Sequence, residues 1–289
     1  MATSRLSQRH QRGQEMTKVR LHEDLWTFAQ RRWKGIYDVD PFGFDEDLTD
    51  HVLAPLLTPL ERWWWRVAVE GIDNLPEHGP ALLVANHGGV LPFDALMLAL
   101  ALRRARPQSP PVRFLAAELA FRLPLVTPLA RAAGGALACV EDAERLLRAG
   151  AWVGDFPEGY RGLGKRWWRR GRVGRFGNGG AIRLALRTGA TVLPVAIEGS
   201  DDIYPMLADI RPLARLLGLP YVPVTPTFPW LGPLGMVPLP VPWTITVCPA
   251  VDLRGLSAQD AENAALVHTL TEHVRSQVQA ALDRRPLTR

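Results

Sequence analysis

The chain of 289 residues is poor in cysteine and lysine, and it lacks any long apolar segment that is free of charge and repeated proline. Two cysteines, Cys139 and Cys248, are too few for a disulfide framework or a cysteine-based zinc site, so we expect a reducing cytoplasmic setting and no metal. No window of about 18 residues predicts a conventional transmembrane helix. The polar residues 1–20 have no apolar signal-peptide core and predict a disordered basic tail.

The net charge of +5 is concentrated in short segments. Residues 1–20 carry +4 and residues 161–175 carry +7, whereas residues 38–50 are acidic. Two local patches argue against a protein coated in nucleic-acid-binding charge. With 47% hydrophobic and 22% charged residues, the composition is that of a folded globular protein.

Short apolar runs alternate with helical patterns through most of the chain. The runs predicted as strands are Val67–Glu70, Ala81–Asn86, Val112–Ala116, Ala136–Cys139, Ala151–Phe156 and Val192–Ile197. The predicted helices are Phe93–Arg104, Leu119–Ala133, Glu141–Ala149, Ala181–Thr188 and Ser257–Arg284, the last opening with a Ser257 and Asp260 cap. This alternation predicts an α/β fold, with a mixed sheet flanked by helices and a helical N-terminal segment over residues 21–60 that a loop at Asp38–Asp47 interrupts.

Residues 216–251 carry no charge and nine prolines. Proline at this spacing does not allow a regular helix, so we expect an extended apolar loop region with a short strand near Trp243–Val247.

His87 follows the strand Ala81–Asn86 at its carboxyl end, where open α/β sheets bind ligands. Gly88 and Gly89 allow a tight turn, and Asp94 lies in the first turn of the next helix. Asp94 can return to one imidazole nitrogen and leave the other to accept a proton, as in a general base with an orienting acid. A buried histidine satisfied by an acid at a helix N-terminus fits too, and spacing alone favours this structural interpretation.

A second polar group follows the strand Ala151–Phe156. Glu158 and Gly159 occupy the turn after it, with Arg161 and Lys165 close behind. With the His87 motif, this arrangement resembles the lysophospholipid acyltransferase superfamily, the glycerolipid acyltransferases. Four blocks of that family occur in order: Asn86-His87 through Asp94, Gly134-Gly135 through Glu141, Phe156-Pro157-Glu158-Gly159, and Val192-Leu193-Pro194-Val195-Ala196-Ile197. The resemblance covers roughly residues 60–255 and implies an acyltransferase domain over 61–289 with a glycerolipid acyltransferase-like fold.

The resemblance implies transfer of a fatty acyl group from acyl-CoA, a co-substrate with no further cofactor, to a hydroxyl of a lysophospholipid or related glycerolipid. His87 would be the general base oriented by Asp94, and Glu158, Gly159, Arg161 and Lys165 would bind the substrate. The chain has no Gly-x-Ser-x-Gly motif, and neither cysteine adjoins a motif histidine, so an acyl-enzyme is not expected. The alternative is a catalytically inactive lipid-binding or membrane-surface-binding protein of the same fold, against which the intact His87 and Asp94 pair argues.

Some positions depart from the common family pattern. Six residues separate His87 from Asp94 instead of four, which is similar to the branch near the mono- and diacylglycerol acyltransferases and actinobacterial lysophospholipid acyltransferases. Tyr160 replaces the usual Thr, and Val140 stands where Arg is frequent. These positions help to hold the acceptor's phosphate in phosphate-using members, so the acceptor stays open.

The basic segment 161–175 surrounds Trp167 and Trp168 and leads through glycines 177–180 into a helix. Helix-start amides and arginines suit a phosphate, so we expect a cradle for CoA, a lysophospholipid head group or an anionic membrane surface. A solvated loop is the alternative for any single arginine. Nucleic acid is disfavoured as a partner because the segment adjoins the Glu158 motif, and a P-loop is disfavoured because Gly-Lys-Ser/Thr is absent.

Three adjacent tryptophans, Trp63 to Trp65, have an interfacial character, although core packing is an equal alternative for any one of them. With the uncharged segment 216–251, they predict a peripheral or monotopic protein at the cytoplasmic face of the cell membrane. Trp230 and Trp243 are candidates to line an acyl-chain tunnel.

Overall fold

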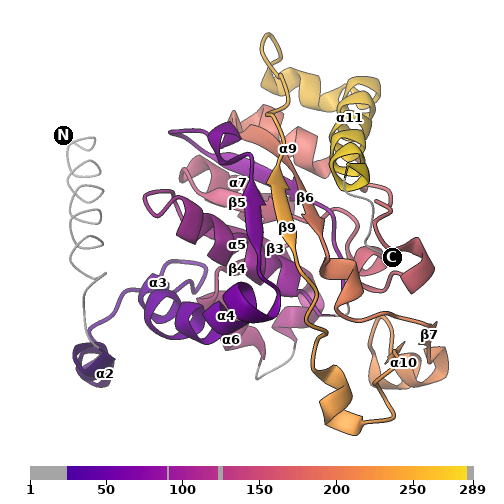
Figure 1. The fold of residues 1–289 in the computed structure, drawn as a ribbon. Helices are drawn as coiled ribbons and strands as arrows, with labels where there is room; N and C mark the ends of the chain where they lie inside the picture. Colours follow the sequence, from indigo (N-terminus) through magenta and orange to yellow (C-terminus); the bar gives the residue numbers. More distant parts are fainter. Residues whose placement is uncertain (1–24, 90, 123–125, 285–289) are drawn as a thin grey trace.

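The structure, a computed structural model, describes residues 25–89, 91–122 and 126–284. A seven-stranded sheet forms its centre, in the order β1-β9-β6-β2-β5-β3-β4 (Figure 1). Its strands are β1 (Ala68–Glu70), β2 (Ala81–Ala85), β3 (Val112–Ala116), β4 (Gly135–Leu137), β5 (Trp152–Asp155), β6 (Thr191–Glu198) and β9 (Thr244–Val247). β9 pairs antiparallel with β6, and the other pairs of this sheet are parallel. The expected mixed sheet is therefore confirmed.

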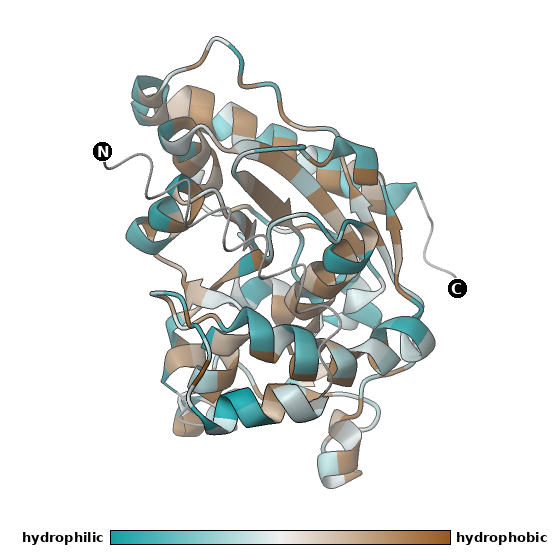
Figure 2. Ribbon diagram, turned by 90° about the vertical axis from the view of Figure 1, so that its left-hand side faces the viewer, coloured by the Kyte–Doolittle hydropathy of each residue, from teal (hydrophilic) through white to brown (hydrophobic). Residues whose placement is uncertain are grey.

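Helices cover both faces of the sheet. The helix α5 (Phe93–Ala105) packs on one face, and α7 (Val140–Arg148), α9 (Gly180–Thr188) and α11 (Ala264–Asp283) pack on the other. Because side chains alternate along a strand, Leu83 of β2 enters the α5-side core and Leu82 enters the opposite one. Figure 2 shows the result, with hydrophobic strands inside and hydrophilic residues on the outer surfaces of helices.

Two predicted helices are wrong in extent. In place of one helix over Leu119–Ala133, the described residues form a 3-10 turn η4 (Glu118–Phe121) and a helix α6 (Val126–Ala132). Pro128 has no N–H to donate and lies in the first turn of α6, where that donor is not needed. The apolar pattern continues on the N-terminal side of Pro128, so the predicted helix began too early in the chain.

The predicted helix Ser257–Arg284 is also divided. The cap at Ser257 and Asp260 is present, but it starts a 3-10 turn η8 (Ala258–Glu262). Asn263 then leaves the helical conformation and accepts a hydrogen bond from the Leu266 N–H, so it caps α11.

The N-terminal described segment is helical, with an interruption where the sequence predicts one. It contains α2 (Leu25–Trp33) and, after a loop, α3 (Glu46–Leu48), the π-type turns η1 (Thr49–Leu53) and η2 (Leu60–Trp64), and α4 (Ala54–Pro59) between them. Ion pairs of α5 hold this segment: Arg103 contacts Glu46 at 2.9 Å and Asp50 at 2.6 Å. Arg104 contacts the buried Glu61 at 2.6 Å. The predicted tail 1–20 lies outside the described residues.

The connection from β6 to β9, residues 199–243, is the apolar, proline-rich region. It contains a 3-10 turn η6 (Ser200–Asp202), α10 (Arg211–Leu217), a two-stranded sheet of β7 (Ala208–Asp209) and β8 (Pro223–Val224), and a 3-10 turn η7 (Gly232–Met236). As expected, the proline-rich stretch is mostly irregular and ends in a strand. Because β6 and β9 are antiparallel, this connection leaves and returns at one edge of the sheet. β2 is parallel to β6 and ends at that same edge.

The tryptophans divide between core and surface. Trp65 is fully buried and stacks on Trp243 with ring centroids 4.8 Å apart, whereas Trp63 is exposed. Trp243 is therefore a core residue. Trp230 is exposed as well, and neither of the two tunnel candidates lines the apolar cavity described below.

Candidate active site

His87 and Asp94 meet at the carboxyl end of β2. The His87 Nδ1 atom lies 2.6 Å from Asp94 Oδ2, and the Asp94 side chain is fully buried. The backbone N–H groups of Gly88 and Ala95 also donate to this carboxylate, each at 2.9 Å. With two amides donating to it, the ionised carboxylate accepts its third hydrogen bond from Nδ1–H. This arrangement places the ring proton on Nδ1 and leaves the lone pair of Nε2 as the basic site.

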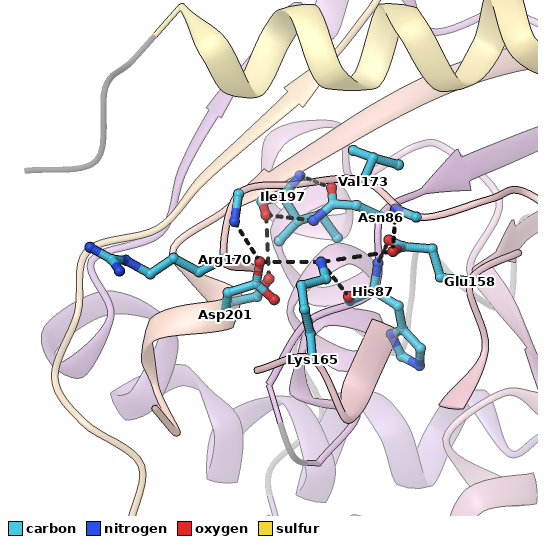
Figure 3. Close-up of polar contacts among 12 residues, drawn as sticks. Asn86, His87, Glu158, Lys165, Arg170, Val173, Ile197 and Asp201 are labelled. Carbon is cyan, nitrogen blue, oxygen red and sulfur yellow. Dashed lines mark hydrogen bonds and ion pairs between the residues drawn. The ribbon is translucent and has the colours of Figure 1, made fainter. Parts of the chain in front are cut away.

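The imidazole ring is packed but not sealed. It contacts Phe156 with ring centroids 4.6 Å apart, and its side chain remains 10% exposed. Figure 3 shows the ring directed away from the polar contacts of Glu158, Lys165 and Asp201. The backbone of His87 thus belongs to one polar network, while its side chain belongs to the pair with Asp94.

Glu158 fixes the backbone at the strand ends. Its Oε1 atom accepts a hydrogen bond from the His87 N–H at 3.1 Å, and its Oε2 atom accepts one from the Gly174 N–H at 2.7 Å. Both oxygens of this buried carboxylate are therefore engaged with the main chain.

Lys165 joins Glu158 to a carboxylate at the end of β6. Its Nζ atom lies 3.3 Å from Asp201 Oδ2 and 3.8 Å from Glu158 Oε2 (Figure 3). It also donates to the His87 carbonyl at 3.5 Å. Burial raises the pKa of the Asp201 carboxyl, and the nearby Lys165 ammonium opposes that rise. The Asp201 Oδ1 atom is buried with no hydrogen-bond partner within the described part of the chain.

Asn86 fastens β2 to β6 next to this network. Its Nδ2 atom donates to the Ile197 carbonyl at 3.0 Å, and its Oδ1 atom accepts from the Ile197 N–H at 2.7 Å. Asn86 belongs to the first motif block, and the structure gives it this pinning function.

The structure brings together four of the six predicted site residues: His87, Asp94, Glu158 and Lys165. Gly159 forms the following turn with a φ of 54°, and Arg161 is exposed on the short helix α8 (Tyr160–Leu163). The substrate-binding functions of these residues stay predictions. Sequence reasoning missed Asp201, although it lies just past a predicted strand end, the same signal that singled out His87.

The basic segment is only partly available for a ligand. Besides Lys165, Arg170 has an acidic partner, with its Nε atom 3.2 Å from Asp202 Oδ1. Arg166 donates to the Leu207 carbonyl at 2.8 Å. The exposed cations are Arg161, Arg169, Arg172 and Arg175.

An apolar cavity of about 170 Å³ lies between the N-terminal helices and α5. Leu53, Leu57, Leu96, Leu100, Phe114 and Leu129 are among its lining residues. Phe114 belongs to the same core as Phe156, which contacts the His87 ring. The cavity is therefore on the face of the sheet that carries the imidazole.

Among the described residues, no group of three or more His, Cys, Asp or Glu side chains is arranged to hold a metal ion. No helix in the described ranges has both the length and the apolar composition needed to cross a bilayer.

Comparisons with known proteins agree with one another. The family model described as Acyltransferase matches residues 66–198. An uncharacterized protein of Mycobacterium leprae is 48% identical over 257 residues, covering 89% of this chain and 70% of that protein. The chloroplastic 1-acyl-sn-glycerol-3-phosphate acyltransferase LPAT1 of Arabidopsis thaliana is 29% identical over 167 residues, or 54% of this chain and 42% of the relative.

A solved structure shares the fold. The 1-acyl-sn-glycerophosphate acyltransferase PlsC from Thermotoga maritima matches with a TM-score of 0.50 and 22% identity, over 77% of this chain and 73% of that one. The matched family region begins before β1 and ends with β6, so it contains the His87 and Asp94 pair and Glu158. This chain therefore belongs to the acyltransferase family.

Proposed function

We propose that the protein transfers a fatty acyl group from acyl-CoA to a hydroxyl group of a lysophospholipid or related glycerolipid. The observation that carries this proposal is the His87 and Asp94 pair, whose 2.6 Å contact fixes the ring and directs its basic nitrogen away from the carboxylate. Membership of the acyltransferase family supports the reaction class.

In the proposed reaction, His87 Nε2 takes the proton of the acceptor hydroxyl as its oxygen attacks the thioester carbonyl carbon. The tetrahedral intermediate then collapses, its carbon–sulfur bond breaks, and the thiolate of CoA leaves. The proton on Nε2 passes to that thiolate, which restores the neutral imidazole. Asp94 stabilises the imidazolium between these steps, because its negative charge is already in contact with Nδ1.

The remaining motif residues are proposed to position the acceptor. Glu158 acts by holding the His87 backbone in place, since both of its oxygens are already hydrogen-bonded. Gly159 forms the turn that leads into α8. Arg161 is exposed on α8 and can offer its guanidinium to an acceptor phosphate. Lys165 has two carboxylate partners, so any contact with a phosphate would compete with them.

The apolar cavity beside α5 is proposed to hold the acyl chain. Its leucine and phenylalanine lining matches the chemistry of a hydrocarbon. We further propose that the protein works at an anionic membrane surface on the cytoplasmic face. The exposed arginines of the segment 161–175 support this location.

A product assay tests the proposed function. Purified protein is incubated with one of two labelled donors, acyl-CoA or acylated acyl carrier protein. The acceptors are lysophosphatidic acid, other lysophospholipids, monoacylglycerol and diacylglycerol. Products are identified by mass spectrometry. We expect an acylated product from at least one acceptor with acyl-CoA, and none with the His87→Ala variant. Lipid binding without any product would instead favour a catalytically inactive lipid-binding protein.

A further inference from the structure

We infer that one exposed apolar surface docks the protein on a lipid leaflet. This surface, called the apolar tip below, consists of the exposed side chains Trp230, Leu231, Leu234 and Val237 around η7. Trp230 is 74% exposed and Leu234 is 73% exposed. The choice of lipid as the partner rests on the proposed function, because the proposed acceptor resides in a bilayer.

The topology places the apolar tip at the edge of the sheet that carries His87. The connection 199–243 starts at the carboxyl end of β6 and returns to β9, and β2 ends beside β6. Figure 1 shows this connection in orange at the end of the molecule where β6 finishes, with the turn of η7 projecting from it. The Tyr221 ring of the same connection is so close to Gly164 that an added Cβ would lie 2.9 Å from it. Gly164 directly follows α8.

A second apolar element continues the surface. Trp64 donates through its indole N–H to the Pro238 carbonyl at 2.8 Å. This contact places the segment Trp63 to Trp65 beside the apolar tip. Trp63 is 75% exposed. Indole rings favour the headgroup depth of a bilayer because they combine an apolar body with one polar N–H.

The backbone of the apolar tip is suited to an apolar medium because its own groups pair with one another. The Leu231 N–H donates to the Thr227 carbonyl at 2.9 Å, and the Thr227 hydroxyl donates to the Gly235 carbonyl at 3.0 Å. The Tyr204 hydroxyl fixes the far side by donating to the Met236 carbonyl at 2.6 Å. Backbone groups that are paired internally lose little when water is replaced by lipid.

The charges around the surface favour an anionic leaflet. Residues 203–241 contain one acid, Asp209, and two cations, Arg211 and Arg215. Asp209 accepts a hydrogen bond from the Val222 N–H at 3.0 Å and also pairs with Arg211, whose Nε atom lies 3.8 Å from Asp209 Oδ2. The net charge of this stretch is therefore +1. Arg62 and Arg66, both exposed, flank Trp63 to Trp65 in the sequence. Cations around an uncharged centre match lipid phosphates above hydrocarbon. A symmetric contact with a second copy of the chain is less favourable, because it would bring these arginines of the two copies together and their like charges would repel.

Vesicle binding by a paired substitution tests the inference. The full chain is co-sedimented with vesicles of phosphatidylcholine and phosphatidylglycerol as wild type, as Trp230→Ser/Leu234→Ser, and as the control Trp33→Ser. Trp33 lies on α2 and is 93% exposed. We expect the partition coefficient of the double variant to fall at least about tenfold, because two exposed apolar side chains can no longer enter the leaflet. The control is expected to bind like wild type.

Three results would overturn the docking surface. The first is unchanged vesicle binding by the double variant. The second is a loss of vesicle binding by Trp33→Ser as large as that of the double variant. The third is a double variant that loses self-association in gel filtration but still binds vesicles. Acylation of a short-chain acceptor below its micelle concentration is measured in parallel and should be equal in all three proteins. If none of them acylates any acceptor, yet the double variant alone loses vesicle binding, the docking surface stands and the proposed function fails.

Discussion

At the scale of single residues, the charges behind His87 are the most consequential feature of the site. Lys165 and Glu158 have side chains only 9% and 2% exposed, and Asp201 is nearly as buried. The Lys165 ammonium thus lies between the carboxylates of Glu158 and Asp201, next to the His87 backbone. The network stabilises the site only as a unit, since a buried charge without its partner is costly.

Replacing Lys165 by methionine should therefore be strongly destabilising. We expect Lys165→Met to lose about 3–5 kcal/mol in the free energy of unfolding, because two buried carboxylates lose their cation. The double variant Lys165→Met/Asp201→Asn should recover part of that loss, since one of the two charges is removed. Urea unfolding measures both. A loss below about 1 kcal/mol in the single variant would show that the network does not carry this cost.

Asp155, at the end of β5, gives a pH-dependent prediction. Burial raises its pKa from 3.8 to about 6. The folded protein therefore binds this proton more tightly than the unfolded chain, so the contribution of Asp155 to stability falls as the pH rises from about 4 to 6. The cost is then constant at higher pH. Asp155→Asn should stabilise the protein by about 3 kcal/mol near pH 8, and this gain should shrink as the pH is lowered toward 4. Urea titrations at several pH values check this, and a gain independent of pH would contradict it.

The residues of the site differ in how well the sequence predicts them. His87 and Glu158 follow apolar strands directly and belong to motif blocks, so both position and chemistry were visible. Asp201 follows a predicted strand end as His87 does, but it was not predicted because it stands beside a second aspartate and belongs to no motif block. Its importance comes from the pairing of β6 with β2, which brings the ends of distant segments together.

At the scale of elements, the short helix α8 is positioned by close backbone contact. A Cβ atom added at Gly162 would lie 2.7 Å from His87 Cβ and 2.9 Å from Glu158 Cβ. No larger side chain fits there unless α8 moves away from both motif residues. Only a residue without a side chain at position 162 allows α8 to lie this close to His87 and Glu158.

Gly162→Ala should impair catalysis more than stability. We expect kcat to fall at least about tenfold, because displaced catalytic groups lose their alignment with the reacting atoms. Gly180→Ala at the start of α9 is the matched control, since an added Cβ there has no neighbour within 4 Å. Steady-state CoA release by both variants provides the measurement. Equal activity of the two variants would refute the role of this contact.

Elements were predictable where their pattern is regular. The strands of the seven-stranded sheet appear within two residues of their predicted bounds, because each is a short apolar run between turn residues. The two short strands β7 and β8 were not predicted. One of the two helix errors arises from local capping, because the Asn263 side chain starts α11 and outweighs a continuous apolar periodicity. In the other, Pro128 lies in the first turn of α6, a position that suits a helix start. The π-type turns η1 and η2 were also beyond the sequence pattern. Pro55 and Pro59 belong to α4, which lies between η1 and η2, and neither has an N–H to donate to the regular hydrogen bonds of an α-helix.

At the scale of the whole molecule, the N-terminal helices and the sheet enclose the apolar cavity together. Ion pairs from α5 to Glu46, Asp50 and Glu61 keep these helices over it. The cavity could not be predicted from the sequence, because its walls come from several separate segments between Phe44 and Trp152.

Narrowing the cavity should shorten the preferred acyl chain. Ala99 of α5 lines it, so Ala99→Phe places a ring in space that is proposed for the hydrocarbon. We expect kcat/KM to fall at least about tenfold for long-chain acyl-CoA and much less for short-chain acyl-CoA. A competition assay with mixed acyl-CoA donors measures the preference. An unchanged preference in a folded variant would place the acyl chain elsewhere.

The central claim is that the Nε2 atom of His87 removes the acceptor's proton while Asp94 holds the ring. The most direct measurement is kcat for CoA release by purified His87→Gln, with the fold checked by circular dichroism and the melting temperature. We predict a fall of about 10² to 10⁴ in kcat with a native-like fold. Turnover within threefold of wild type would contradict the account.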